Sequence, residues 1–183
     1  MSCVATVTGV KTRFADLAGI ALETLAARRG ILIDTLDKTS ILEGFADLAP
    51  HKDVTEALSL LRAKGYRTIA FTNSSEVLVK NQISNAGLAP LFDRIISVEK
   101  TGQFKPSAAV YHYAASEINQ SIGDLRLIAT HDWDTHGALS AGMKAAYIDR
   151  GAVYNPLYLK PDIFAANMVD LAGAIIAADN LAP

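Results

Sequence analysis

The chain has 183 residues, of which 50% are hydrophobic and 20% are charged, and its formal net charge is −2. This composition is typical of one globular domain and excludes a disordered or collagen-like chain. No basic stripe is present to neutralise phosphates, so we expect no nucleic-acid partner. The apolar runs are far shorter than the roughly 20 residues that span a bilayer, and no secretory signal precedes them. We therefore expect a cytoplasmic protein without a membrane partner.

The first part of the chain carries helical patterns. Residues 12–29 place apolar side chains at helical spacing and end in a basic turn followed by Gly30. Residues 40–48 favour a second, shorter helix. Asp53 and Glu56 then form a capping-box pattern, which predicts that the next helix begins just after Asp53.

From residue 67 on, apolar strands alternate with amphipathic helices. The strands show little polar alternation, which is typical of parallel strands that are covered on both faces. We predict strands at 67–72, 94–98, 125–130 and 144–148, and helices at 75–87, 107–118, 134–142 and 162–178. This order predicts an α/β fold with a doubly wound parallel sheet, whose functional residues lie beyond the carboxyl ends of the strands.

Polar side chains follow the first two of these strands. Thr72-Asn73-Ser74-Ser75 places hydroxyl and amide groups at a helix N-terminus, where an anion can bind. Ordinary capping of the helix by Ser74 or Ser75 explains the same pattern equally well. After the second strand, Lys105-Pro106 places an ammonium group where it can neutralise a carboxylate or a phosphate, although most lysines are simply solvated.

The densest polar cluster follows the third strand. The stretch from Thr130 to His136 contains two His, two Asp and the single Trp of the chain. An Asp that caps the next helix beside a packed Trp is the alternative interpretation. Because polar density at a strand end is where sites occur in this type of sheet, we favour a site.

These three pieces, in this order, resemble the haloacid dehalogenase (HAD) superfamily. The patterns Thr72-Asn73-Ser74, Lys105-Pro106 with Val110-Tyr111, and His131-x-Trp133-Asp134 are similar to those of the type II L-2-haloacid dehalogenases. Three further stretches add to the resemblance, which runs from about residue 12 to about residue 150: Pro50-His51-x-Asp53-Val54, Asn85-Ala86-Gly87-Leu88 and Phe92-Asp93-x-Ile95-x-Ser97-Val98. The resemblance implies part of a helical cap at 1–49 and a HAD-like Rossmannoid core at 50–183.

The resemblance also implies an activity, the hydrolysis of a short 2-haloalkanoic acid to the 2-hydroxy acid with inversion. Thr72 and Asn73 would bind the carboxylate of the substrate or of the nucleophile. Lys105 would keep the nucleophile ionised by charge pairing. Asp134, with His131 where the family usually has Asn, would orient the lysine and the hydrolytic water.

Four further residues are assigned to the substrate site by the same resemblance. Tyr111 would donate a hydrogen bond near Lys105, and Thr130 would assist Asp134. Trp133 and Phe14 would form apolar walls around the halide. The expected partner is a small 2-haloacid, and a homodimer is left open.

The third strand end argues against a metal site. In the Gly-Asp-x-x-x-Asp motif of superfamily phosphatases, an acid at this position binds Mg²⁺. Here the frame that ends at Asp134 places Thr130 at the first acid and Ala129 at the glycine. A hard cation needs carboxylate oxygens, so we expect no metal and no cofactor.

One family feature has no match. Family members begin with an apolar strand that ends in Asp-x-x-x-Thr, and this Asp attacks the halogen-bearing carbon. Residues 1–9 contain no acid, and the substrate-binding arginine of the first cap helix also has no match. We therefore interpret the chain as lacking the nucleophile strand and expect little turnover from it alone.

Two alternatives remain. The stretch Ile31-Leu32-Ile33-Asp34, with Thr39 after it, could be a degenerate nucleophile motif of a metal-dependent phosphatase, but its Asp-to-Thr spacing is one residue too long. The simpler interpretation is a solvated loop in which Asp34 or Asp37 caps the next helix. The second alternative is a non-catalytic interaction protein, which would form a stable oligomer without either activity.

Overall fold

The computed structural model describes residues 1–180, which form an α/β fold with parallel strands. The strands are β1 (Ile69–Thr72), β2 (Arg94–Ser97), β3 (Arg126–Ala129), β4 (Lys144–Ile148) and β5 (Ile163–Ala165). The helices are α1 (Ser2–Thr8), α2 (Phe14–Arg28), α3 (Thr35–Glu43), α4 (Val54–Ala63), α5 (Glu76–Asn85), α6 (Ala108–Glu117), α7 (Asp132–Ser140) and α8 (Met168–Asn180). No helix in this part of the chain is both long enough and apolar enough to cross a membrane.

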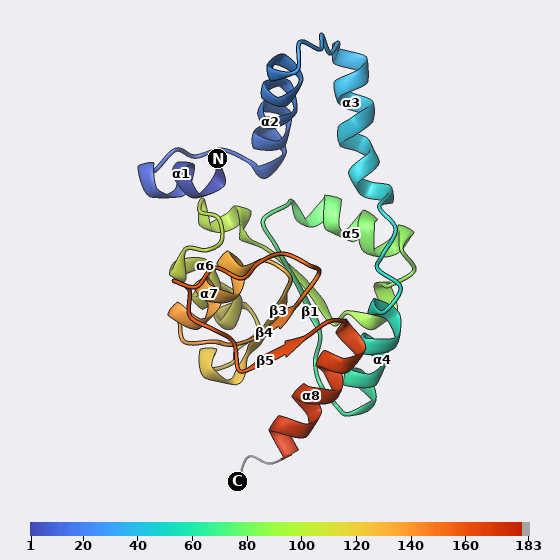
Figure 1. Ribbon diagram of the computed structural model, residues 1–183, viewed down its shortest axis with the longest axis vertical. Coiled ribbons are helices and arrows are strands. Elements are labelled where there is room, and N and C mark those ends of the chain that lie inside the picture. Colours follow the sequence, from blue (N-terminus) through green and yellow to red (C-terminus); the bar gives the residue numbers. More distant parts are fainter. Residues whose placement is uncertain (181–183) are drawn as a thin grey trace.

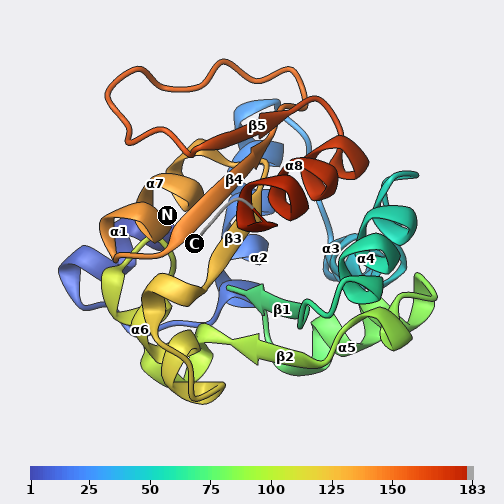
Figure 2. The ribbon, with the colours of Figure 1, turned by 90° about the horizontal axis from the view of Figure 1, so that it is seen from below.

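The strands form two parallel sheets instead of one continuous sheet. β1 pairs with β2, and β4 lies between β3 and β5. Figure 2 shows that β1 and β3 are the inner strands of these two sheets. Within residues 1–180, β1 and β3 share no ladder hydrogen bonds and no strand lies between them. The predicted α/β fold with parallel strands is confirmed, but the sheet is divided at its centre.

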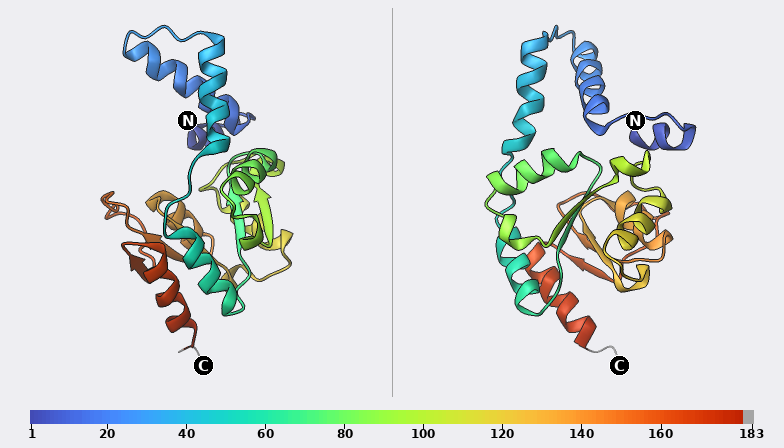
Figure 3. Two further views of the ribbon diagram at one scale, coloured as in Figure 1. Left: turned by 90° about the vertical axis from the view of Figure 1, so that its right-hand side faces the viewer. Right: turned by 180° about the vertical axis from the view of Figure 1, so that it is seen from behind.

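Helices cover both faces of the divided sheet, as the doubly wound prediction requires. α4 and α8 pack on one face, against Ile128 of β3 and Ala146 of β4. α6 and α7 pack on the other face, against Phe71 of β1 and Leu127 of β3. Leu127 and Ile128 therefore point to opposite faces, because successive side chains alternate along a strand. The two helix layers are seen from two further sides in Figure 3.

A helical hairpin of α2 and α3 projects from the strands (Figure 1). α2 ends before Gly30, whose φ of 68° lies in the left-handed region that glycine adopts without a steric penalty. α3 begins because the Asp34 side chain accepts a hydrogen bond from the Asp37 backbone N–H at 2.8 Å. Lys38 and Glu23 form an ion pair between the two helices at 2.5 Å. The interpretation of Asp34 as a helix cap is confirmed, and residues 31–34 form no strand.

The helix predicted at 40–48 was misplaced. α3 covers Thr35–Glu43, and a 3₁₀ turn over Gly44–Asp47 follows it. The Asp34 cap starts the helix earlier than the apolar pattern indicated. Gly44, an αR residue, then ends the α-helical part.

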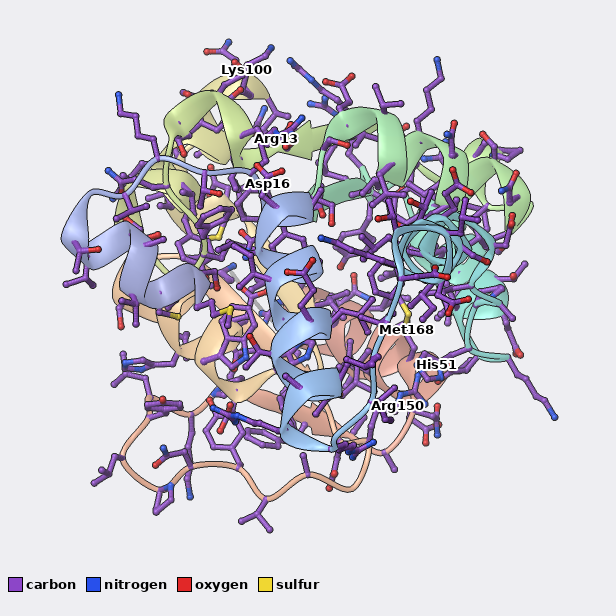
Figure 4. All side chains as sticks on the ribbon, turned by 90° about the horizontal axis from the view of Figure 1, so that it is seen from above. Arg13, Asp16, His51, Lys100, Arg150 and Met168 are labelled. Atoms are coloured by element: carbon purple, nitrogen blue, oxygen red, sulfur yellow. The ribbon has the colours of Figure 1, made fainter. Side chains whose placement is uncertain are left out.

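Asp53, in the linker before α4, forms hydrogen bonds with residues close to the C-terminal helix. Its carboxylate accepts two hydrogen bonds from the Arg150 guanidinium, at 2.8 and 2.9 Å, and one from the Met168 backbone N–H at 2.7 Å. Figure 4 shows the Arg150 and Met168 side chains near His51 of the linker. The Arg150 guanidinium and the Met168 N–H lower the pKa of Asp53 to about 2. α4 begins at Val54, directly after Asp53, as predicted, but the capping box is wrong, because the Asp53 side chain makes no cap hydrogen bond to α4.

The final predicted helix, at 162–178, is partly wrong. Residues Ile163–Ala165 pair with β4 as β5, and α8 begins at Met168. Ile163 is buried while Phe164 is exposed, which is the alternation of an edge strand. The Asn167 side chain accepts a hydrogen bond from the Asp170 backbone N–H at 2.9 Å and so marks the start of the helix.

Candidate active site

Segments that follow three strands meet at the carboxyl ends of the sheets. Thr72 ends β1 and continues into Asn73, and Asp134 lies in the first turn of α7, which follows β3. Lys105 comes from the loop between β2 and α6. The carboxyl ends of parallel strands are where α/β proteins place their sites.

A buried ion pair joins Lys105 to Asp134. The Lys105 Nζ atom lies 2.7 Å from Asp134 Oδ2, and the two side chains are only 10% and 5% exposed. The Nζ atom also donates to the Phe71 carbonyl at 3.3 Å and lies 4.9 Å from the centre of the Phe71 ring. The ammonium group is thus held by a charge, a carbonyl dipole and an aromatic face.

Tyr111 forms a hydrogen bond to the second carboxylate oxygen of Asp134. Its hydroxyl donates to Asp134 Oδ1 at 2.7 Å and lies 3.1 Å from the Asp134 carbonyl oxygen. Tyr111 is fully buried, and burial, reinforced by the negative charge of Asp134, raises its pKa far above the ordinary value. The phenol therefore stays protonated and acts as a fixed donor to the carboxylate.

Thr72 and Asn73 shape the loop next to the lysine. The Asn73 side-chain oxygen accepts a hydrogen bond from the Lys105 backbone N–H at 2.9 Å, and Thr72 Oγ1 accepts one from the Ser74 backbone N–H at 2.9 Å. Ser75 caps α5 through the Leu78 backbone N–H at 3.2 Å. Within residues 1–180 the Thr72 hydroxyl proton and the Asn73 NH₂ group donate to no protein acceptor. Both remain available to an anionic ligand.

The remaining predicted site residues lie beside other aromatic rings or line a cavity. His131 is exposed, and its ring lies 5.2 Å from the ring of Trp133. Phe14, at the start of α2, packs against Phe104, with 6.3 Å between the ring centres. The structure therefore gives Trp133 and Phe14 separate aromatic partners. Thr130 and His131 line a cavity that Phe71, whose carbonyl accepts from Lys105, also lines.

This cavity lies between β1 and β3 and has a volume of about 790 Å³. β1 contributes Ile69 and Phe71 to its lining, and β3 contributes Leu127 and Ile128. Leu58 of α4 is among the helix residues that close it. The cavity is thus apolar in its middle and polar at both ends, with Thr130 and His131 at the carboxyl end of the strands and Arg67, Asp124 and Lys144 at the amino end.

Gly137 is a residue that the sequence analysis missed. A Cβ atom at Gly137 would lie 2.5 Å from Pro106 Cβ and 2.6 Å from Tyr111 Oη. Only glycine lets α7 approach Tyr111 closely enough for the hydrogen bond to Asp134. The signal in the sequence was a small residue one helical turn after Asp134, on the same face.

The site offers neither a metal-binding cluster nor the candidate nucleophile Asp34 within residues 1–180. Among residues 1–180, no three His, Cys, Asp or Glu side chains gather in a way that could hold a metal ion. Asp34, the candidate of the phosphatase alternative, lies in the loop between α2 and α3 and not at the end of a strand.

The chain is similar in sequence to known dehalogenases. A family model described as haloacid dehalogenase-like hydrolase matches residues 6–125. The (S)-2-haloacid dehalogenase H-109 of Pseudomonas putida is 30% identical over 142 residues, which are 77% of this chain and 63% of that enzyme. The haloacetate dehalogenase H-2 of Moraxella sp. (strain B) is 25% identical over 170 residues, covering 92% of this chain and 75% of that enzyme. The chain thus spans less than two thirds of the P. putida enzyme.

Solved structures show the same fold. The L-2-haloacid dehalogenase RSc1362 superposes with a TM-score of 0.90 at 21% identity, covering 96% of this chain and 79% of that one. The L-2-haloacid dehalogenase of Xanthobacter autotrophicus, with chloropropionic acid covalently bound, gives 0.87 at 19% identity, with 96% and 80% covered. With the family match over more than half of its length, the chain belongs to the haloacid dehalogenase-like hydrolases.

Proposed function

We propose that this site serves the hydrolytic dehalogenation of short 2-haloalkanoic acids to 2-hydroxy acids. The observation that carries the proposal is the buried Lys105–Asp134 pair, set beside the free donors of Thr72 and Asn73. These donors can bind a carboxylate, and the lysine can hold a second carboxylate ionised. The relatives named as an (S)-2-haloacid dehalogenase and a haloacetate dehalogenase support this choice of substrate class.

The reaction needs a carboxylate nucleophile. A carboxylate oxygen attacks the carbon that bears the halogen, a C–O ester bond forms, and the halide leaves with the electrons of the broken bond. Water then adds to the ester carbonyl, the acyl C–O bond breaks, one proton of the water passes to the released oxygen and the other is lost to solvent. The 2-hydroxy acid departs and the carboxylate is restored. In this scheme His131 and Thr130 orient the water, and Trp133 and Phe14 enclose the halide.

Asp134 cannot be that nucleophile. One of its oxygens binds the Lys105 ammonium and the other accepts from Tyr111, both at 2.7 Å. In residues 1–180, Asp134 is also the only carboxylate within ion-pair distance of Lys105. We therefore propose that the 183-residue chain positions and polarises a substrate but turns over little of it unaided.

Halide release from 2-chloropropionate tests this proposal. The 183-residue chain should release almost none. A chain extended at its N-terminus by an apolar strand ending in Asp-x-x-x-Thr should release halide, and the Asp-to-Asn form of that strand should not. Lys105→Met in the extended chain should lower the rate by at least about a hundredfold. If the 183-residue chain itself turns over the haloacid and Asp34→Asn abolishes the activity, then Asp34 is the nucleophile and the assignment is wrong.

A further inference from the structure

Two successive backbone N–H groups of the loop that carries Lys105 are bound by side chains of other elements. The Phe104 N–H donates to Thr6 Oγ1 of α1 at 3.0 Å, and the Lys105 N–H donates to Asn73 Oδ1 at 2.9 Å. The first of these hydrogen bonds joins residues that lie 98 positions apart in the chain. Pro106, the next residue, has no N–H to offer. The main chain is therefore held from two sides at the point where the Lys105 side chain begins.

The neighbouring hydrogen bonds of this loop are local. The Thr101 hydroxyl donates to the Val98 carbonyl at 2.7 Å and accepts from the Gln103 N–H at 3.1 Å. These bonds shape the loop between β2 and α6 but do not connect it to another element. The position of the loop relative to the rest of the fold therefore depends on the hydrogen bonds of the Phe104 and Lys105 N–H groups and on apolar packing.

Apolar contacts keep Thr6 and Phe104 together. Ala5, the residue before Thr6, is buried in one apolar cluster with Phe104 and Tyr111. The Phe14 ring, at the start of α2, packs against the Phe104 ring as well. Figures 1 and 2 both show α1 beside the chain that leads into α6. The hydrogen bond of Thr6 is therefore part of a packed interface and not an isolated contact on the surface.

The far end of the lysine side chain is also fixed. Its Nζ atom lies 2.7 Å from Asp134 Oδ2 and 3.3 Å from the Phe71 carbonyl oxygen. Because the stem of a lysine is flexible, the ammonium stays beside Asp134 only while the backbone at its base stays in place. Phe104 is 4% exposed, so water could not replace Thr6 Oγ1 as the acceptor of its N–H. Without that oxygen the loop would have to move to satisfy the donor.

We propose that Thr6 is a positioning residue for Lys105. Its hydroxyl oxygen fixes the Phe104 N–H, and the loop that is fixed in this way holds the Lys105 ammonium against Asp134. Docking of α1 is thereby coupled to the geometry of the candidate active site. The positioning depends only on these contacts, whereas its effect on halide release rests on the proposed function.

Four substitutions in α1 separate this role from a general stabilising one. Thr6→Val keeps the branched shape of the side chain and removes the acceptor, whereas Thr6→Ser keeps the acceptor. Thr6→Ala removes the oxygen without placing a methyl group against the N–H, so the test stays valid if Thr6→Val does not fold. Thr8→Val is the matched control, because Thr8 is exposed on the same helix and its hydroxyl donates to the Val4 carbonyl at 2.8 Å.

Hydrogen exchange and lysine labelling of the 183-residue chain measure the positioning directly. In Thr6→Val, the amides of Phe104 and Lys105 should exchange at least about tenfold faster than in the parent chain, and Lys105 should react at least about threefold faster with trinitrobenzenesulfonate. Thr6→Ser and Thr8→Val should match the parent in both measurements. The proposal is overturned if the Lys105 amide and its labelling rate keep the parent values in Thr6→Val and Thr6→Ala, because Thr6 then only attaches α1 to the fold.

Activity of the N-terminally extended chain separates this proposal from the proposed function. Thr6→Val should lower kcat for 2-chloropropionate at least about tenfold and change KM by less than about twofold, and Thr6→Ser should restore kcat. The reason is that Lys105 acts on the nucleophile, whereas the donors of Thr72 and Asn73 remain available to the substrate. An equal loss of kcat in Thr8→Val would contradict the positioning role. If the extended parent chain releases no halide, the proposed function is wrong, and exchange and labelling still decide the role of Thr6.

Discussion

The Lys105 ammonium and the Asp134 carboxylate lie 2.7 Å apart, although one follows β2 and the other begins α7. They connect the two sheets at their carboxyl ends, where no ladder hydrogen bond crosses from β1 to β3. Both side chains are almost fully buried, so neither charge can be solvated if the other is removed. The pair is therefore a structural tie as well as a candidate catalytic group.

Replacing one residue of this pair should lower the free energy of unfolding much more than replacing both. Lys105→Met leaves Asp134 as an uncompensated buried charge and should lower the free energy of unfolding by about 3–5 kcal/mol. Adding Asp134→Asn removes that charge and keeps an acceptor for Tyr111, so the double variant should be more stable than Lys105→Met alone. Urea unfolding of the four proteins of this cycle measures the coupling. Additive losses would show that the two charges do not interact.

Gly137→Ala should destabilise the protein although alanine is the better helix former. The new methyl group would lie within 2.6 Å of both Pro106 Cβ and Tyr111 Oη, and forcing α7 away should cost about 1–3 kcal/mol. Gly173→Ala in α8 is the matched control, because a Cβ there has no neighbour within 4 Å. That variant should gain about 0.5–1 kcal/mol. Equal effects of the two changes on urea unfolding would contradict the close contact.

The Asp53–Arg150 pair should make the stability of the folded chain depend on pH. The pKa of Asp53 is about 2 in the folded chain and about 3.9 in an unfolded one, so its contribution is complete above pH 4 and is lost as the pH falls through 2. Asp53→Asn should lower the free energy of unfolding by about 1–2 kcal/mol at pH 7, with a smaller difference below pH 3. Asp16→Asn removes the exposed pair with Arg13, which Figure 4 labels, and should change little. A difference between Asp53→Asn and the parent that is constant from pH 2 to 7 would contradict this linkage.

Mg²⁺ should bind at this site no more tightly than in the millimolar range. Thr130 offers a hydroxyl where a carboxylate would be needed, and both oxygens of Asp134 are already engaged by Lys105 and Tyr111. Calorimetric titration and melting curves with Mg²⁺ should show no saturable effect at about 1 mM. Specific binding tighter than that would revive the phosphatase alternative.

The sequence predicts the strand ends well because parallel α/β units carry a strong local signal. An apolar strand followed by polar residues places Thr72, Lys105 and Asp134 at one edge of the fold, and the structure brings Lys105 and Asp134 into contact. The same reasoning does not predict the strand at 163–165. A three-residue strand just before a helix has too few residues to show its own periodicity.

Contacts between distant segments could not be predicted in this way. Asp53 has the spacing of a capping box with Glu56, yet a guanidinium from residue 150 takes its carboxylate instead. The small residue at Gly137 is visible in the sequence, but its role is not, because that role depends on how closely α7 approaches Pro106 and Tyr111. Such positions are decided by packing, and the local pattern of the chain contains no information about the partner.

The division of the sheet also predicts how the two halves of the molecule separate. β1 pairs only with β2, and β3 only with β4, among the residues that the structure describes. The two halves are otherwise joined by side-chain contacts, such as the packing of α4 on α8 and the hydrogen bond from the Tyr66 hydroxyl to Asp179 at 2.9 Å. They can therefore move apart without breaking a ladder hydrogen bond. Backbone amides of residues 69–97 and of residues 126–165 should consequently exchange with solvent as two cooperative units, each with its own opening free energy.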